Sequence, residues 1–111
     1  MQRRALLRAV RTGLRSPHDV CDAHPDLVRA GRHVGEATAD GCPICERAEL
    51  RLVTYVFGKR VGRRSGKVVP RHDIGSMCER YGALNVYTVE VCTDCNWHHL
   101  RESFWIGREA G

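Results

Sequence analysis

The sequence has no long apolar run and no apolar leader segment. No stretch of its 111 residues approaches the roughly 20 apolar residues that a helix needs to cross a bilayer. Arg8, Arg11 and Arg15 interrupt the apolar residues near the start, so we expect no secretory signal and no contact with a membrane. The expected setting is a reducing cytoplasm, where paired cysteines are metal ligands more often than disulfides.

Two long stretches contain no acidic residue. Residues 1–18 carry five arginines, and residues 59–71 carry six basic residues. Positive charge segregated in this way favours a polyanionic partner more strongly than the net charge of +5 does. Lysine is also scarce, with two against sixteen arginines. That ratio suits bidentate phosphate contacts, but a GC-rich genome produces the same ratio, and we prefer that explanation.

The sequence does contain two cysteine pairs with C-x-x-C spacing, Cys42 with Cys45 and Cys92 with Cys95. A tight turn of this spacing aims two thiolates at one metal ion, and two such turns together make a closed tetrahedral site that is typical of structural zinc. A chain of 111 residues with 42% hydrophobic residues has a modest core, which a metal cross-link would stabilise. We therefore predict that these four cysteines bind Zn²⁺.

Four thiolates fill the tetrahedral coordination of zinc, so no further residue is needed as a ligand. His98 and His99 follow Cys95, and either could replace a cysteine, but we expect both beside the site or at the surface. A closed site leaves no position for water, so it predicts a structural metal and no catalysis. A redox C-x-x-C pair normally occurs singly at the start of a helix, and that context is absent here.

The two remaining cysteines give weaker signals. Cys78 falls on the apolar side of a predicted helix and is expected to be a buried free thiol. Cys21 lies near His18 and His24, and a second metal site there is conceivable. No second cysteine is close to Cys21 in the sequence, so we do not expect such a site.

The N-terminal segment, residues 1–35, is predicted to be helical. Apolar spacing indicates helices over residues 2–12, 17–21 and about 22–33. Ser16 and Pro17 are typical of the cap and first residue of the second helix. In outline the segment resembles a helix-turn-helix, but small helical bundles that bind no DNA share this outline.

Residues 36–111 are predicted to form the ribbon, which gives an α+β fold: a short antiparallel sheet with one inserted helix. We expect strands over 50–57, 67–69 and 84–91, and a helix over 71–82. Pairing of the first and last of these strands would bring the two cysteine turns together. Residues 35–41 are expected to be a linker, and residues 97–106 to be a strand or short helix that covers the ribbon.

Both basic stretches supply candidate phosphate contacts. Those of the second stretch, which we expect at a hairpin tip, are Lys59, Arg60, Arg63, Arg64, Lys67 and Arg71. Those of the first helix are Arg4, Arg8, Arg11 and Arg15. Tyr55, Phe57 and Tyr87 could stack on bases, although a core position explains the aromatics better.

Several segments together resemble a small family of proteins from high-GC Gram-positive bacteria, known only as a domain of unknown function. The segments that carry the resemblance are DVCDAHP at 19–25, CPIC at 42–45, LVTYVFG at 52–58 and VEVCTDCNWHHL at 89–100. The resemblance implies a cytoplasmic bacterial protein with paired cysteine turns, and it carries no established activity.

Two functions remain open. We expect a non-enzymatic zinc-ribbon protein that binds RNA or DNA, or a machine that contains them, such as RNA polymerase or the ribosome. The alternative is a protein–protein adaptor that uses Trp97, Phe104 and Trp105 as anchors. An exposed Trp105 beside Phe104 would favour the adaptor. An enzyme ranks last, because the sequence offers no nucleophile motif.

Overall fold

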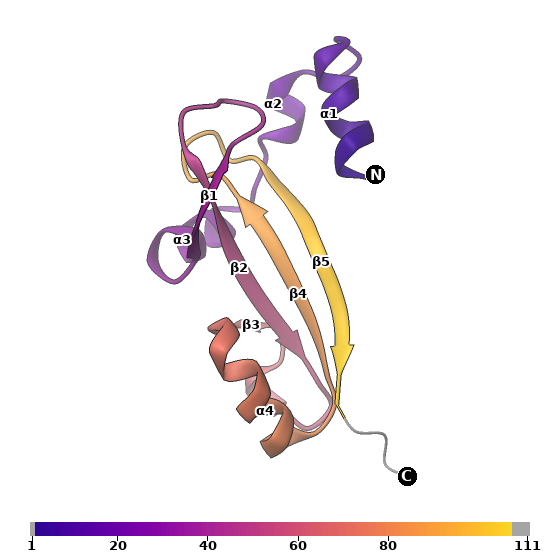
Figure 1. The fold of residues 1–111 in the computed structure, drawn as a ribbon, viewed down its shortest axis with the longest axis vertical. Coiled ribbons are helices and arrows are strands. Elements are labelled where there is room, and N and C mark those ends of the chain that lie inside the picture. Colours follow the sequence, from indigo (N-terminus) through magenta and orange to yellow (C-terminus); the bar gives the residue numbers. More distant parts are fainter. Residues whose placement is uncertain (1, 108–111) are drawn as a thin grey trace.

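The computed structural model describes residues 2–107, without the side chain of Arg64, as an elongated molecule of 50 × 28 × 23 Å (Figure 1). The N-terminal elements are α1 (Arg3–Arg11), α2 (Pro17–Val20), α3 (Pro25–His33), β1 (Glu36–Gly41) and β2 (Glu49–Phe57). After β2 come the 3-10 turn η1 (Gly62–Arg64), β3 (Lys67–Val68), the 3-10 turn η2 (Arg71–Asp73), α4 (Ile74–Tyr81), β4 (Leu84–Val91) and β5 (His98–Ile106).

The sheet is antiparallel and runs in the order β1-β2-β4-β5, with the short β3 beside the far end of β2. β1 with β2 and β4 with β5 are two hairpins that lie side by side. β2 and β4 pair from Arg51 opposite Val91 to Phe57 opposite Asn85. This register brings the turns of both hairpins to the same end of the sheet, where the four cysteines lie.

Helices cover parts of both faces of the sheet. On one face, Leu7 of α1 packs with Leu50 near the cysteine turns, and Met77 of α4 packs with Val56 and Val86 at the other end. On the opposite face, Val28 of α3 packs on Val53 and Val91. The far half of this second face carries no helix, and at its margin Tyr55 and Val68 pack against the cluster that contains Val28.

Local sequence explains the short N-terminal helices. The Ser16 hydroxyl accepts a hydrogen bond from the His18 amide, and the Asp19 carboxylate accepts one from the Ser16 amide, so the cap of α2 is reciprocal. Pro17 occupies the first helical position, where its missing N–H costs nothing. At the end of α3, the Arg51 guanidinium donates to the carbonyls of Gly31 and Gly35 at 3.1 and 2.7 Å. The sheet thus caps the helix that rests on it.

Most predicted elements are present. The helices near 2–12, 17–21 and 22–33, the strands at 50–57, 67–69 and 84–91, and the one-faced helix before Gly82 all form. Of the predicted segment 97–106, residues 98–106 are a strand, β5, but it extends the sheet at its edge and does not cover it. The N-terminal helices share buried clusters with the sheet, and the division into two domains at residue 35 stays a prediction.

The prediction of a linker at residues 35–41 is wrong. Residues 36–41 form β1, which pairs with β2 at the edge of the sheet. Nearly all of its side chains are exposed, and its pairing is interrupted between Ala37 and Gly41. An edge strand of this kind is held by backbone hydrogen bonds, so it has no apolar alternation for a sequence reading to detect.

Candidate metal centre

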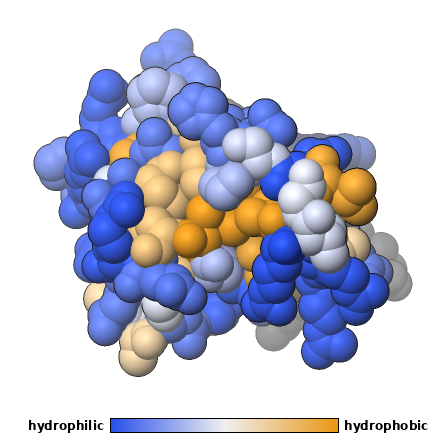
Figure 2. Space-filling model, turned by 90° about the horizontal axis from the view of Figure 1, so that it is seen from above, coloured by the Kyte–Doolittle hydropathy of each residue, from blue (hydrophilic) through white to orange (hydrophobic). Residues whose placement is uncertain are grey.

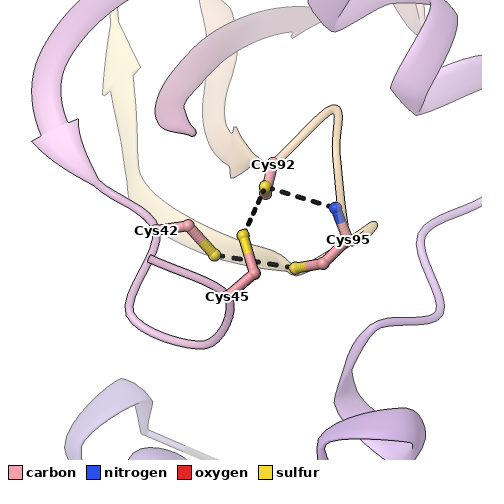
Figure 3. Close-up of side chains that lie close together, drawn as sticks. All are labelled: Cys42, Cys45, Cys92 and Cys95. Atoms are coloured by element: carbon pink, nitrogen blue, oxygen red, sulfur yellow. Dashed lines mark hydrogen bonds between the residues drawn. The ribbon is translucent and has the colours of Figure 1, made fainter. Parts of the chain in front are cut away.

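Four thiols from the two hairpin turns converge at one end of the sheet (Figure 3). The Sγ atoms of Cys42, Cys45, Cys92 and Cys95 all lie within 4.8 Å of one another. Across the two turns, Cys42 and Cys95 approach to 3.6 Å, and so do Cys45 and Cys92. The prediction that these four cysteines form one group is therefore confirmed.

The two turns repeat the same backbone pattern. The Cys42 amide donates to the carbonyl of Ala48, and the Cys92 amide donates to that of Trp97, both at 2.8 Å. The residue after each second cysteine, Glu46 or Asn96, has a positive φ and donates its amide back to the first cysteine of its pair. Both turns are thus closed in the same way, and each aims its two sulfur atoms at the other turn.

Backbone amides also point at the sulfur atoms. The Ile44 amide donates to Cys42 Sγ, the Arg47 amide to Cys45 Sγ and the Cys95 amide to Cys92 Sγ, each at 3.4 Å. Such donors share the negative charge of thiolates and orient them toward an ion. They act where the sulfur atoms are partly withdrawn from water, since Cys42 and Cys92 are buried.

The thiols differ in their readiness to lose a proton. Burial raises the pKa of Cys42 to about 12 and that of Cys95 to about 12. For Cys45, burial acts in the same upward direction, but the Arg47 amide and the neighbouring thiols outweigh it, and its pKa is lowered. Without a cation, burial therefore keeps Cys42 and Cys95 protonated, whereas the charged form of Cys45 is favoured.

The donor set fits zinc. Four sulfur atoms at about 2.3 Å from a tetrahedral ion lie about 3.8 Å apart, close to the 3.6 Å of the two cross-turn pairs. His98 and His99 are not in the set: His98 Nε2 lies 3.0 Å from a carboxylate oxygen of Asp22, and the His99 ring is stacked on Trp97.

A fifth thiol, which the sequence reading left aside, reaches this group. Cys21 follows α2, and its Sγ lies 3.4 Å from Cys95 Sγ as a hydrogen-bond donor. Burial raises the pKa of Cys21, so it is a neutral thiol beside the four-sulfur group. Its partner is 74 residues away in the chain, which is why neighbouring sequence gave no sign of it. His18 and His24 do not form a second cysteine–histidine metal group with it within residues 2–107.

A buried carboxylate fastens the N-terminal helix beside the centre. Glu90 is 1% exposed and accepts bonds from the guanidinium of Arg3, at 2.9 and 3.2 Å, and from the indole of Trp97, at 3.0 Å. Trp97 directly follows the second cysteine turn and is 0% exposed. The proposal that Trp97 anchors a partner is therefore wrong, because its side chain is fully buried and has no surface to offer a partner.

The two basic stretches lie at opposite ends of the sheet (Figure 1). α1 is beside the cysteine turns, whereas residues 58–66 connect the far end of β2 to β3, as the expected hairpin tip. Within these two stretches, the exposed basic residues are Arg4, Arg8, Arg11, Arg15, Lys59, Arg60, Arg63, Lys67 and Arg71. Arg71 pairs with Glu102 at 3.1 Å, and the side chain of Arg64 lies outside the described part.

Aromatic side chains gather on the far half of the face that α3 partly covers. The register aligns Phe57, Asn85 and Trp105 in one row and Tyr55, Tyr87 and Ser103 in the next. Phe57 and Trp105 are 42% and 52% exposed, and the Phe57 and Tyr87 rings meet edge to face at 5.4 Å. Phe104, 38% exposed, alternates to the other face of β5. The preference for core positions is thus wrong for Phe57, because α4 covers only the opposite face.

The fold and the sulfur group define a class: a small α+β protein with an antiparallel sheet and a four-cysteine candidate zinc site. The chain belongs to a family of unknown function, DUF5318, whose profile matches residues 1–111. This confirms the resemblance drawn from the sequence.

Relatives from mycobacteria support the same membership. The chain is 37% identical over 107 residues to "Uncharacterized protein Mb0050" of Mycobacterium bovis and to "Uncharacterized protein Rv0049" of Mycobacterium tuberculosis. The alignment covers 96% of this chain and 78% of each relative. No solved structure matches. Among the helices of residues 2–107, none has the length and apolar character of a membrane span.

Proposed function

We propose that the protein is a non-enzymatic, cytoplasmic zinc protein that binds nucleic acid, either free or within a machine such as RNA polymerase or the ribosome. The cysteine group supports the structural part of this proposal. Cys42, Cys45, Cys92 and Cys95 supply a complete tetrahedral set of soft ligands, which leaves no position at which water or a substrate could be activated. The ion therefore joins the two hairpins.

The observation that carries the binding proposal is the open sheet face next to an acid-free loop. Phe57 and Trp105 offer exposed ring surface, with the partly buried Tyr87 beside Phe57, and aromatic rings on a sheet accept stacked bases regardless of sequence. The connection that follows Phe57 carries exposed Lys59, Arg60 and Arg63, and residues 59–71 contain no acid to offset them. Stacking surface with adjacent positive charge suits single-stranded RNA or DNA.

Titration of the zinc-loaded protein with labelled single-stranded RNA and DNA at several salt concentrations tests this proposal. We expect affinity to fall steeply with added salt, and the double variant Arg60→Glu with Arg63→Glu to weaken binding at least tenfold. The control, Arg29→Glu, reverses the charge of an exposed arginine on α3 and is expected to bind nearly normally. Absence of binding even at low salt would refute the proposal.

The exposure of Phe104 and Trp105 favours a second candidate, the protein–protein adaptor. Exposed tryptophan is a frequent anchor in protein interfaces. A pull-down from a native lysate, with and without nuclease, separates the two candidates. Capture of one defined protein that survives nuclease and is lost in Trp105→Ala would favour the adaptor, whereas loss on nuclease treatment favours nucleic acid.

A further inference from the structure

Cys21 is held against the four-sulfur group by its surroundings. Val20 is buried in the cluster that contains Cys42 and Cys92. The Cys21 amide donates a hydrogen bond to the carbonyl of Pro17. The Ala23 amide donates one, at 3.0 Å, to the carbonyl of Asn96, the residue that follows Cys95. Backbone contacts on both sides of Cys21 therefore fix its sulfur 3.4 Å from that of Cys95.

The approach is open to small molecules. Cys21, Cys45 and Cys95 line one hollow of about 310 Å³, together with Pro17, His18, Ile44 and Arg47. Viewed toward the end of the molecule that carries the N-terminal helices and the cysteine turns, the surface has an apolar area ringed by hydrophilic residues (Figure 2). Both Cys21 and Cys95 are partly exposed. A reagent the size of hydrogen peroxide can enter this hollow.

We propose that Cys21 is a resolving cysteine for the metal centre. When peroxide oxidises the centre, Cys21 captures Cys95 in a reversible disulfide, and the set of four sulfur ligands loses one member. The inference rests on the metal-binding part of the proposed function and is independent of nucleic acid.

The chemistry needs one molecule of hydrogen peroxide for each disulfide. The Cys95 thiolate attacks the peroxide, an S–O bond forms, the O–O bond breaks and hydroxide leaves. The Cys21 sulfur then attacks the Cys95 sulfur, so that the S–S bond forms and the S–O bond breaks. The departing hydroxide takes the Cys21 proton and leaves as water. Two sulfur atoms have together lost two electrons, and the peroxide has gained them.

Position distinguishes Cys21 from the other thiols. A disulfide between Cys42 and Cys95, or between Cys45 and Cys92, would remove two ligands at once, and each of these pairs is separated by 3.6 Å. Cys21 is closer to Cys95 and stands outside the four. Cys78 packs in the separate cluster under α4 and lines no part of the hollow, which makes it the matched control.

The test treats the zinc-loaded full chain with one equivalent of hydrogen peroxide, follows zinc release with a chromophoric chelator and maps disulfides by mass spectrometry without reduction. Digestion with trypsin leaves Cys21 in the peptide of residues 16–29 and the second cysteine turn in the peptide of residues 81–101. Fragmentation of the second peptide in the mass spectrometer distinguishes Cys92 from Cys95. We expect a Cys21–Cys95 link in wild type and in Cys78→Ser, with zinc released, and full zinc rebinding after reduction by dithiothreitol.

Cys21→Ser is expected to bind zinc normally but to form no such link, and in excess peroxide its Cys95 should be oxidised beyond the sulfenic acid, so that dithiothreitol no longer restores zinc binding. Disulfide mapping in the wild-type protein tests the inference even if Cys21→Ser folds poorly. Zinc release with Cys21 still reduced, or with disulfides only among the four ligands, would overturn the inference. A protein that carries no zinc before treatment would instead refute the metal-binding proposal.

Discussion

At the scale of single residues, metal binding depends on the protonation state of the cysteine thiols. Two of its four thiols, Cys42 and Cys95, are driven toward the neutral form by burial, while amides and neighbouring thiols favour the charged form of Cys45. The pKa values of Cys42 and Cys95 lie near 12, so both thiols are protonated in the metal-free protein at neutral pH. A cation must therefore displace their protons.

Zinc binding should accordingly release protons and weaken in acid. Because the raised pKa values keep Cys42 and Cys95 protonated below about pH 12, each contributes a tenfold loss of affinity for every unit by which the pH falls. Calorimetry at pH 7.5 in buffers of different ionisation enthalpy should count at least two protons released per zinc. A count of zero, with zinc bound, would contradict this assignment of protonated thiols.

Gly31 is a second residue whose role the structure specifies. A Cβ at this position would lie 2.7 Å from Cγ1 of Val91, so α3 rests directly on the sheet there. Gly31→Ala should lower the free energy of unfolding by about 1–3 kcal/mol through overpacking. Gly75→Ala in α4, where a Cβ meets nothing within 4 Å, should raise it by up to about 1 kcal/mol through helix propensity. Urea denaturation of the two variants should therefore shift in opposite directions.

At the scale of elements, α1 is docked by an ion pair in which the carboxylate is buried and the guanidinium is partly exposed. Arg3 neutralises Glu90 beneath the helix, while Arg4 is exposed on its outer side. Leu7 is the one fully buried residue of α1, and Leu6 and Val10 pack partly buried against the same cluster. The arginines of α1 are therefore not equivalent, although the sequence presents them as one basic stripe.

Removal of each arginine should show this difference. Arg3→Ala leaves the buried Glu90 carboxylate without its guanidinium partner, although the Trp97 indole still donates to it, and should lower the free energy of unfolding by about 3 kcal/mol. Arg4→Ala should change it by less than about 0.5 kcal/mol. Thermal denaturation monitored by circular dichroism measures both, and equal effects would disprove the docking role of Arg3.

Most of the helices and strands, and the four-cysteine group, could be predicted from the sequence. Cys42 and its three partners were found because C-x-x-C spacing is a local signal, and β2 and β4 because they are rich in β-branched residues. Cys21 was missed because its sulfur partner is distant in the chain. Glu90 was missed although it shares the parity of the buried Leu84 and Val86, which alternation along the strand could have revealed. Exposure of Trp105 could not be read, because it depends on where α4 packs.

At the scale of the whole molecule, the metal should govern the end of the sheet at which it lies. Trp97 is buried against Cys42 and Cys92, whereas Trp105 is exposed at the opposite end of β5. In Trp105→Phe, fluorescence reports on Trp97 alone, since the chain has two tryptophans. Chelation of zinc should shift its emission to the red as water enters the cluster, and added zinc should restore it. A metal-free protein with an unshifted spectrum would contradict a structural role for zinc.

The sulfur atoms that meet across the two turns belong to residues 47 and 53 positions apart, although each turn is itself a local structure. Closing a loop of that length costs about 3 kcal/mol of chain entropy from its length-dependent term alone. Formation of either hairpin costs far less, because its strands are neighbours in the chain. An ion bound between the two turns therefore stabilises a long-range contact, and it should act chiefly by slowing unfolding once that contact has formed.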